Sequence, residues 1–288
     1  AISGFGLNSN GEKISKSKNN SELSPQMLIK KYSADNVRYW CANSKLGTDS
    51  YFSEHTIDIG RKLINKIWNV SKFIEMHLQD YEDKEINDYE YIDKWILGKY
   101  QEMEKGFIQY LDEYEVGLAL NILEKFFWNF CDNYIEIVKH RLYRPEEFGN
   151  DARYSGQKTV YTLLYKLLQD FSIFFPFITE EIYQEIYHQE KSIHLTKIKP
   201  LEFNFTNEMK NGDLIVEIIS KVRGEKTNNN VSLKTPVKML DISLNDELNA
   251  AIDKSIKDFK ATLFIQNMNI SSIEEGYQVN KIELEMTD

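Results

Sequence analysis

Apolar residues recur every three or four positions over long stretches of this chain, a spacing that predicts amphipathic α-helices. Over residues 56–79 the apolar and polar positions separate onto opposite arcs of a helix. The apolar arc comprises Leu63, Ile64, Ile67, Val70, Ile74 and Leu78, and the polar arc comprises Arg61, Lys62, Asn65, Lys66, Asn69 and Lys72. Phe73 projects onto the polar arc, between Lys62 and Lys66, where the core cannot easily bury its ring.

The same periodicity predicts four further helices, over residues 89–112, 115–142, 156–174 and 178–187. The second of these is apolar around most of its circumference, which is typical of a helix at the centre of a bundle. We therefore expect residues 55–198 to form a helical bundle.

The amino end follows a different pattern. Residues 2–7 form a short apolar run before a turn, which indicates the end of a strand. Ser24 followed by Pro25, and Ser33 followed by Asp35, are typical of helix starts, so two short helices should come next. The second of these helices carries three apolar residues on one side: Val37, Trp40 and Cys41.

The pattern changes again after residue 198. Residues 199–211 are polar and irregular, which predicts a linker. Helices are expected over 214–226 and 248–259, and strands over 237–244, 261–266 and 279–286. The fold class is therefore mainly α: residues 1–54, the bundle, the linker, and a small α+β unit over 212–288. Four basic residues should form a modest solvated side of that unit: Lys221, Arg223, Lys226 and Lys234.

Composition narrows the class of protein. The two cysteines, Cys41 and Cys131, are far apart and lack the spacing of a zinc site, and the five histidines stand apart from one another. We therefore expect no metal centre. No signal peptide or apolar run long enough to span a membrane occurs, so we expect a soluble, monomeric protein of the cytoplasm.

Charge is distributed unevenly along the chain. The net charge of −10 argues against a protein that coats nucleic acid indiscriminately. Residues 1–74, however, hold eleven Lys and Arg against six Asp and Glu, whereas residues 79–115 hold twelve acidic residues and four lysines. An anionic partner should therefore meet the first part of the chain.

A candidate for phosphate chemistry lies in the run Lys13-Ile14-Ser15-Lys16-Ser17-Lys18-Asn19-Asn20, which follows Gly11. Two lysines three positions apart, interleaved with serines, can bring two ammonium groups and two hydroxyls onto one polyanion. Lysine accelerates phosphoryl or nucleotidyl transfer by stabilising negative charge on the departing phosphates. A run of this composition is otherwise typical of a solvated loop.

Two further groups are candidates for contacts with RNA. Phe73 between cations is the arrangement with which proteins stack unpaired bases, and the alternative is packing against a neighbouring helix. Lys139, Arg141 and Arg144 end the predicted central helix. They form either an exposed patch facing RNA or a set of cations that offsets the helix dipole. Neither a Gly-x-x-x-x-Gly-Lys-Ser/Thr loop nor a Gly-x-Gly-x-x-Gly fingerprint occurs.

Several segments together resemble the class I aminoacyl-tRNA synthetases, and among them the valine-specific enzymes. The run from Lys13 to Ser17 is similar to their Lys-Met-Ser-Lys-Ser signature. The resemblance continues through residues 35–40, 52–54, 61–73, 127–143 and 175–183. It covers residues 2–195 well and the remainder more loosely.

This resemblance implies that the intact protein activates valine with ATP and Mg²⁺ and transfers it to tRNA(Val). Lys16, assisted by Lys13, would stabilise the transferring phosphates, and Ser15 and Ser17 would hold the loop at ATP. The bundle would be the anticodon-binding domain. The residues expected to contact tRNA are Arg61, Lys62, Lys66, Asn69, Phe73, Lys139, Arg141 and Arg144.

The sequence departs from the family pattern in three places. Ile14 replaces the usual Met and keeps an apolar anchor, and Asn19 stands where the family usually has Gly. No His-x-Gly-His motif occurs, so we expect the carboxy-terminal portion of the enzyme, which binds tRNA but is inactive alone and holds no cofactor. The same portion of an isoleucyl or leucyl enzyme, or a helical interaction module without a role in RNA binding, are the alternatives.

Overall fold

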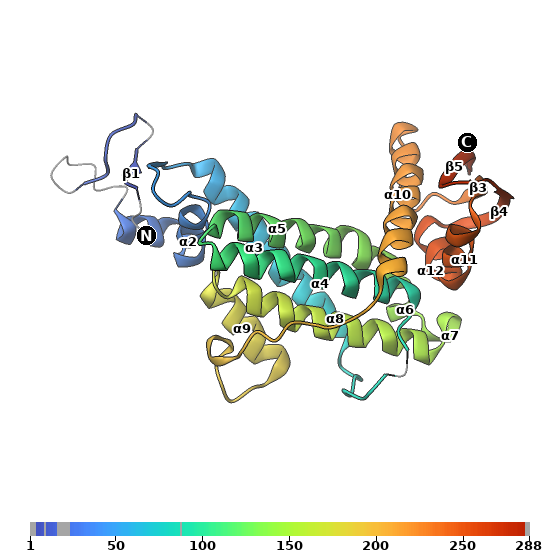
Figure 1. The fold of residues 1–288 in the computed structure, drawn as a ribbon, viewed down its shortest axis with the longest axis horizontal. Helices are drawn as coiled ribbons and strands as arrows, with labels where there is room; N and C mark the ends of the chain where they lie inside the picture. The colour runs from blue at the N-terminus through green and yellow to red at the C-terminus, as the bar shows by residue number, and fades with distance from the viewer. Residues whose placement is uncertain (1–3, 9, 16–23, 87, 286–288) are drawn as a thin grey trace. The chain divides into compact units, whose positions relative to one another are not determined.

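The computed structural model describes residues 4–8, 10–15, 24–86 and 88–285 (Figure 1). The chain forms two compact units. The first contains residues 1–79, 101–127 and 161–201, and the second contains residues 80–100, 128–160 and 202–288. Three of the divisions, at 100/101, 127/128 and 160/161, fall inside helices α4 (Tyr91–Asp112), α5 (Val116–Asn129) and α8 (Asn150–Phe171). The mainly helical fold class predicted from the sequence is confirmed.

The first unit begins with two very short parallel strands, β1 (Gly6–Leu7) and β2 (Ser50–Tyr51). Helices α1 (Pro25–Tyr32) and α2 (Ala34–Ala42) lie between them in sequence, and the long helix α3 (Glu54–His77) follows. Parts of α4, α5 (Val116–Asn129) and α8 complete the unit, together with α9 (Pro176–Tyr187) and a 3₁₀ turn, η4 (Ile193–Leu195). The predicted helices are therefore present, with boundaries shifted by a few residues.

Helix α2 joins the amino-terminal segment to α9. The Asp35 carboxylate accepts the backbone N–H groups of Phe177 and Ile178, at 3.3 and 3.0 Å, in the first turn of α9. Arg38 donates in return to the carbonyl oxygens of Ile173 and Phe174. The buried face of α2 consists of Asp35, Asn36 and Tyr39 rather than the apolar side seen in the sequence.

The contact between α2 and α3 requires a glycine. The Tyr39 ring lies against Gly60, where an added Cβ would come within 2.6 Å of the ring. On its other side the ring stacks on Phe175, with centroids 5.7 Å apart. Gly60 therefore sets how closely the two helices approach.

The segment after α9 is fixed to the first unit by polar side chains. Gln169 on α8 donates to the Thr196 hydroxyl at 2.8 Å. The buried pair Lys166 and Glu104, 3.2 Å apart, then binds the backbone: Lys166 donates to the carbonyl of Lys199, and Glu104 accepts the N–H of Leu201 at 2.9 Å. Residues 196–201 are thus held against α4 and α8, although their composition resembles that of a linker.

In the second unit, the single helix predicted over 115–142 contains one widened turn. Helix α5 passes into a π-helical turn, η3 (Phe130–Tyr134), and continues as α6 (Ile135–Tyr143). The short helix α7 (Pro145–Phe148) follows. A π turn inserts one extra residue into the helix and shifts the direction of the side chains that follow. Tyr134, at the end of the turn, donates to Asp93 of α4 at 2.7 Å.

The end of the chain forms an α+β layer in the second unit (Figure 1). Helix α10 (Thr206–Asn228) packs on α11 (Asp246–Lys254) and α12 (Ile256–Leu263). The three-stranded sheet has the order β4-β3-β5, with β3 (Val237–Leu244) parallel to β4 (Ile265–Ser272) and antiparallel to β5 (Tyr277–Leu284). The predicted strand over 237–244 is confirmed.

Three predictions in this region are wrong. Helix α10 begins eight residues before the predicted start, because its first turns pack on α4: the Trp95 ring covers Gly212, and Asp213 accepts from Trp95 Nε1 at 2.8 Å. The predicted helix over 248–259 is two helices divided at Ser255, and the second of them continues to Leu263, where a strand was expected.

The third error concerns Lys226, which was expected on a solvated face. Its side chain is fully buried and donates to the carbonyl oxygens of Leu233 and Leu263, at 3.0 and 2.7 Å. Burial, reinforced by the nearby charge of Arg223, lowers the pKa of Lys226 to about 8. Lys226 thus caps the carboxyl end of α12, where an ammonium group opposes the negative end of the helix dipole.

The pair formed by Glu104 and Lys166 gives a stability prediction. Glu104→Gln leaves the Lys166 ammonium buried without a carboxylate, so we expect unfolding free energy to fall by about 3 kcal/mol in urea titrations. Glu104→Gln combined with Lys166→Met removes both charges and should recover most of the loss. A single variant as stable as the parent would show that the pair does not hold the segment.

Candidate nucleic-acid interface

The lysine-rich run begins on a small ordered turn in the first unit. The Asn8 side chain accepts the N–H groups of Asn10 and Glu12, at 3.0 and 2.8 Å, and Gly11 supplies a positive φ of 81°. Lys13 then pairs with Leu7 in an isolated antiparallel bridge. The turn therefore directs the chain from β1 into the run.

Lys13 lies on the surface at the end of this turn. Its Nζ atom is 3.6 Å from the centroid of the Phe5 ring, and its side chain is exposed. An exposed ammonium next to the half-buried Ser15 is a donor set that fits a phosphate group. Lys16 and Ser17, the other two residues predicted to bind ATP, lie outside the described residues.

Ile14 anchors the run on an apolar hollow of about 450 Å³. The hollow is also lined by Gly6, Leu28 and the side of α2 that the sequence identified as apolar: Val37, Trp40 and Cys41. Cys41 is exposed overall, but partial removal of its thiol from water raises the pKa of that thiol. An apolar side chain at position 14 therefore has a place to pack, as expected for a residue that replaces Met.

Helix α3 presents the predicted polar face. Its apolar arc is directed inward, with Leu63, Ile67, Val70 and Ile74 buried. Lys62 and Asn69 are exposed on the opposite side, and Lys66 is half-buried. Arg61 is also exposed, and pairs with Asp58 on the same helix at 3.0 Å. Ion pairs between exposed groups are weak, so Arg61 can exchange Asp58 for a phosphate at low cost.

Phe73 lies near the carboxyl end of the same helix. Its side chain is half-buried, and its ring meets the buried His77 ring edge to face, with centroids 4.7 Å apart. The contact with His77 fixes the orientation of the Phe73 ring while part of the ring stays accessible. The cations Lys66 and Lys62 lie about two and three turns earlier on the same helix. An accessible aromatic ring is a surface on which an unpaired base can stack.

The basic end of α6, in the second unit, departs from the prediction. Lys139 is paired with Glu136, and Arg144 with Glu147 at 2.9 Å. Arg141 was expected on an exposed patch, and this is wrong because its side chain is only 1% exposed. It pairs with buried carboxylates and is therefore not accessible to a nucleic acid.

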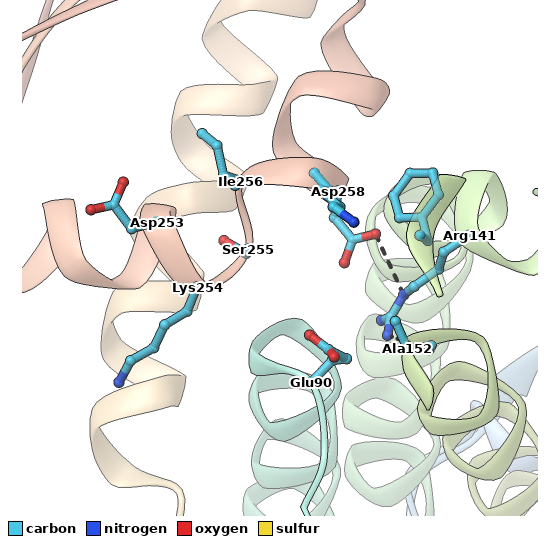
Figure 2. A pocket seen from close by; sticks show the side chains of 10 residues that line it. Glu90, Arg141, Ala152, Asp253, Lys254, Ser255, Ile256 and Asp258 are labelled. Carbon is cyan, nitrogen blue, oxygen red and sulfur yellow. Dashed lines mark hydrogen bonds and ion pairs between the residues drawn. The ribbon is translucent and has the colours of Figure 1, made fainter. Parts of the chain in front are cut away.

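Arg141 forms the centre of a buried cluster. Its terminal nitrogens hold both oxygens of Asp93, at 2.9 and 2.5 Å, and one of them also donates to the carbonyl of Ala152. Its Nε lies 3.4 Å from Asp258 of α12, beside a cavity of about 260 Å³ (Figure 2). The sequence analysis did not predict this cluster, because Asp93 and Asp258 are 48 and 117 positions from Arg141. The one signal in the sequence was an aspartate, Asp93, within the apolar pattern of α4.

Two other features are absent from residues 4–8, 10–15, 24–86 and 88–285. These residues contain no group of three or more His, Cys, Asp and Glu side chains placed to hold a metal ion. Nor does any helix among them have the length and apolar character that crossing a bilayer requires.

Known proteins resemble the chain over most of its length. A valine–tRNA ligase of Rickettsia felis is 37% identical over 280 residues, which cover 92% of this chain and 32% of that protein. Those of Rickettsia conorii and Wolbachia pipientis wMel are 36% and 35% identical, over 100% and 97% of the chain. The chain spans about a third of the length of these relatives.

Among solved structures, a ternary complex of an Agrobacterium radiobacter K84 LeuRS with tRNA aligns with 95% of the chain and 33% of its own, at 11% identity. Its TM-score is 0.49. Two family models match the sequence itself. Residues 1–53 match the class I tRNA synthetases for I, L, M and V, and residues 93–242 match the anticodon-binding domain of tRNA ligases. The chain therefore belongs to the class I tRNA ligases that carry this anticodon-binding domain.

Proposed function

We propose that this chain is the tRNA-binding portion of a valine–tRNA ligase. The intact protein activates valine with ATP and Mg²⁺ and transfers it to tRNA(Val), as a monomer in the cytoplasm. The observation that carries the proposal is the identity of 35–37% to valine–tRNA ligases over at least 92% of the chain. The anticodon-binding family of residues 93–242 supports the assignment of RNA binding to this part of the protein.

The polar face of α3 meets the anticodon arm. Arg61, Lys62 and Lys66 neutralise backbone phosphates, which fixes the position of the RNA but carries no sequence information. Phe73 stacks an unpaired base, and Asn69 offers an amide for a hydrogen bond to a base edge. Lys139 and Arg144 add weaker contacts because glutamates already pair with them.

The lysine run acts in the first step of the reaction, the activation of valine with ATP. Lys16, with Lys13, stabilises the charge that develops on the phosphates of ATP during valine activation, and Ser15 and Ser17 hold the run in place. Packing of Ile14 in the apolar hollow ties the run to α2. Activation and RNA reading are thus assigned to different residues of the first unit.

The first test separates these two roles at Phe73. In the intact enzyme, Phe73→Ala should lower kcat/KM for charging tRNA(Val) about 10- to 100-fold, because stacking contributes about 1–3 kcal/mol per base. Valine-dependent ATP–pyrophosphate exchange should be almost unchanged. Phe73→Trp, which keeps a stacking surface, is the matched control and should retain most of the charging. An equal loss in both assays would contradict the assignment.

The second test addresses Lys16. Lys16→Ala should slow valine activation by about 100-fold or more in single-turnover measurements, because one oriented donor to a developing charge contributes about 3 kcal/mol or more. Valine binding, measured by calorimetry, should stay within about twofold of the parent. Lys18→Ala removes a neighbouring charge and is the control. Activation at the parental rate would remove Lys16 from the mechanism.

A further inference from the structure

The buried carboxylates of Asp93 and Asp258 share the guanidinium of Arg141, where α12 packs on other helices of the second unit. Arg141 holds both oxygens of Asp93 through its two terminal nitrogens. Asp258 is left with Nε alone, at 3.4 Å, as Figure 2 shows. The geometry of that contact does not make a hydrogen bond for either atom. The two carboxylates are therefore held very unequally.

Asp93 has a full set of partners. Besides Arg141, it accepts from the Tyr134 hydroxyl at 2.7 Å and from the Ser155 hydroxyl at 2.5 Å. Its single negative charge already neutralises the guanidinium. A negative charge on Asp258, whose residue is 6% exposed, would thus be a second and largely uncompensated charge in the interior.

The charged groups around Asp258 do not supply the missing cation. Glu90 and Asp93, on the side of α4, both disfavour its negative form, and only Arg141 on α6 favours it. Lys254 lies 5.8 Å from the centre of the Tyr91 ring, and Lys257 donates to the Glu147 carbonyl at 3.1 Å. Asp253 lines the same cavity and points away from Asp258 in Figure 2. Other titratable groups near α12 are Lys260 in its own last turn, Lys226 of α10, which binds its last residue, and His140 of α6, which contacts Phe264.

A proton can reach Asp258 without unfolding of the chain. The side chain faces a cavity of about 260 Å³, which is also lined by Glu90, Ser255 and Ile256 (Figure 2). Burial, the largest cause, together with the charges of Asp93 and Glu90, raises the pKa of Asp258 to about 7, despite the opposing effect of Arg141. Its protonation therefore changes in the neutral range, far above the usual range of an aspartate.

We propose that Asp258 acts as a latch: protonation of its carboxyl controls whether α12 is docked on the other helices of the second unit. With its carboxyl protonated, α12 docks on α6, where Thr262 also contacts the Ile137 carbonyl at 3.4 Å. With the carboxylate charged, its repulsion from Glu90 and Asp93 loosens α11 and α12. The latch concerns the packing of this unit and is independent of the assignment to valine.

The sign of the pH effect follows from the raised pKa. An opened state, in which Asp258 is solvated, releases its proton at the ordinary value near about 4, whereas the docked state keeps the proton up to about 7. Between these values the docked state binds more protons, so docking weakens as pH rises. The opening equilibrium should increase about tenfold per pH unit for one proton released.

Hydrogen exchange of the 288-residue chain tests the latch. After correction for the intrinsic exchange rate, protection of residues 256–263 should fall about tenfold per pH unit between about pH 5 and 7 and then level off. Asp258→Asn mimics the neutral carboxyl, so its protection should match the parent near about pH 4 and stay constant as pH rises. Residues 63–74 of α3, which belong to the other unit, serve as the internal reference.

Two results would overturn the proposal. One is protection of residues 256–263 that changes with pH equally in the parent and in Asp258→Asn. The other is protection of residues 256–263 that does not change with pH in the parent, which would mean that the proton on Asp258 does not control docking. A ¹³C titration of the Asp258 carboxyl gives an independent check: a midpoint near 7 supports the latch, and one near 4 contradicts it.

Discussion

The buried pairing of Asp93 with Arg141 is the interaction on which the second unit most depends. Four elements meet there, because Asp93 on α4 also binds Tyr134 of the π turn and Ser155 of α8 while Arg141 is on α6. A buried charge that loses its partner costs about 3–5 kcal/mol, so none of these elements can shift without the others. The π turn fits this constraint, since it aims Tyr134 at Asp93, and Asp258 adds α12 to the same cluster.

Much of the fold could be predicted from periodicity. The two arcs of α3, the strand at β3 and the cap at Ser33 are local features, and local features are what a sequence pattern encodes. The start of α10 could not be predicted, because residues 206–213 are polar and become helical through contacts with Trp95 on α4. The break at Ser255 could not be predicted either, because the apolar residues keep a helical spacing across it.

In the candidate site, too, some residues could be predicted from the sequence and others could not. The polar face of α3 could be predicted from the spacing of its residues alone. That Ile14 serves as an apolar anchor could be predicted because the run Lys13–Ser17 resembles a known signature. Arg141 could not be assigned from its neighbours: a basic residue in a last turn is usually exposed, and its burial is set by Asp93 and Asp258, far away in sequence. Because its side chain is buried, Arg141 is removed from the set of residues expected to contact tRNA.

The central claim is that the cations on the polar face of α3 bind tRNA. It is tested most directly by the affinity of the 288-residue chain for tRNA(Val) at about 50 and about 200 mM KCl. We expect affinity to fall steeply with salt, and Lys62→Ala combined with Lys66→Ala to weaken binding and reduce the salt slope by about two, whereas Lys105→Ala on α4 has no effect. Binding that is independent of salt, or equally weakened by Lys105→Ala, would contradict the account.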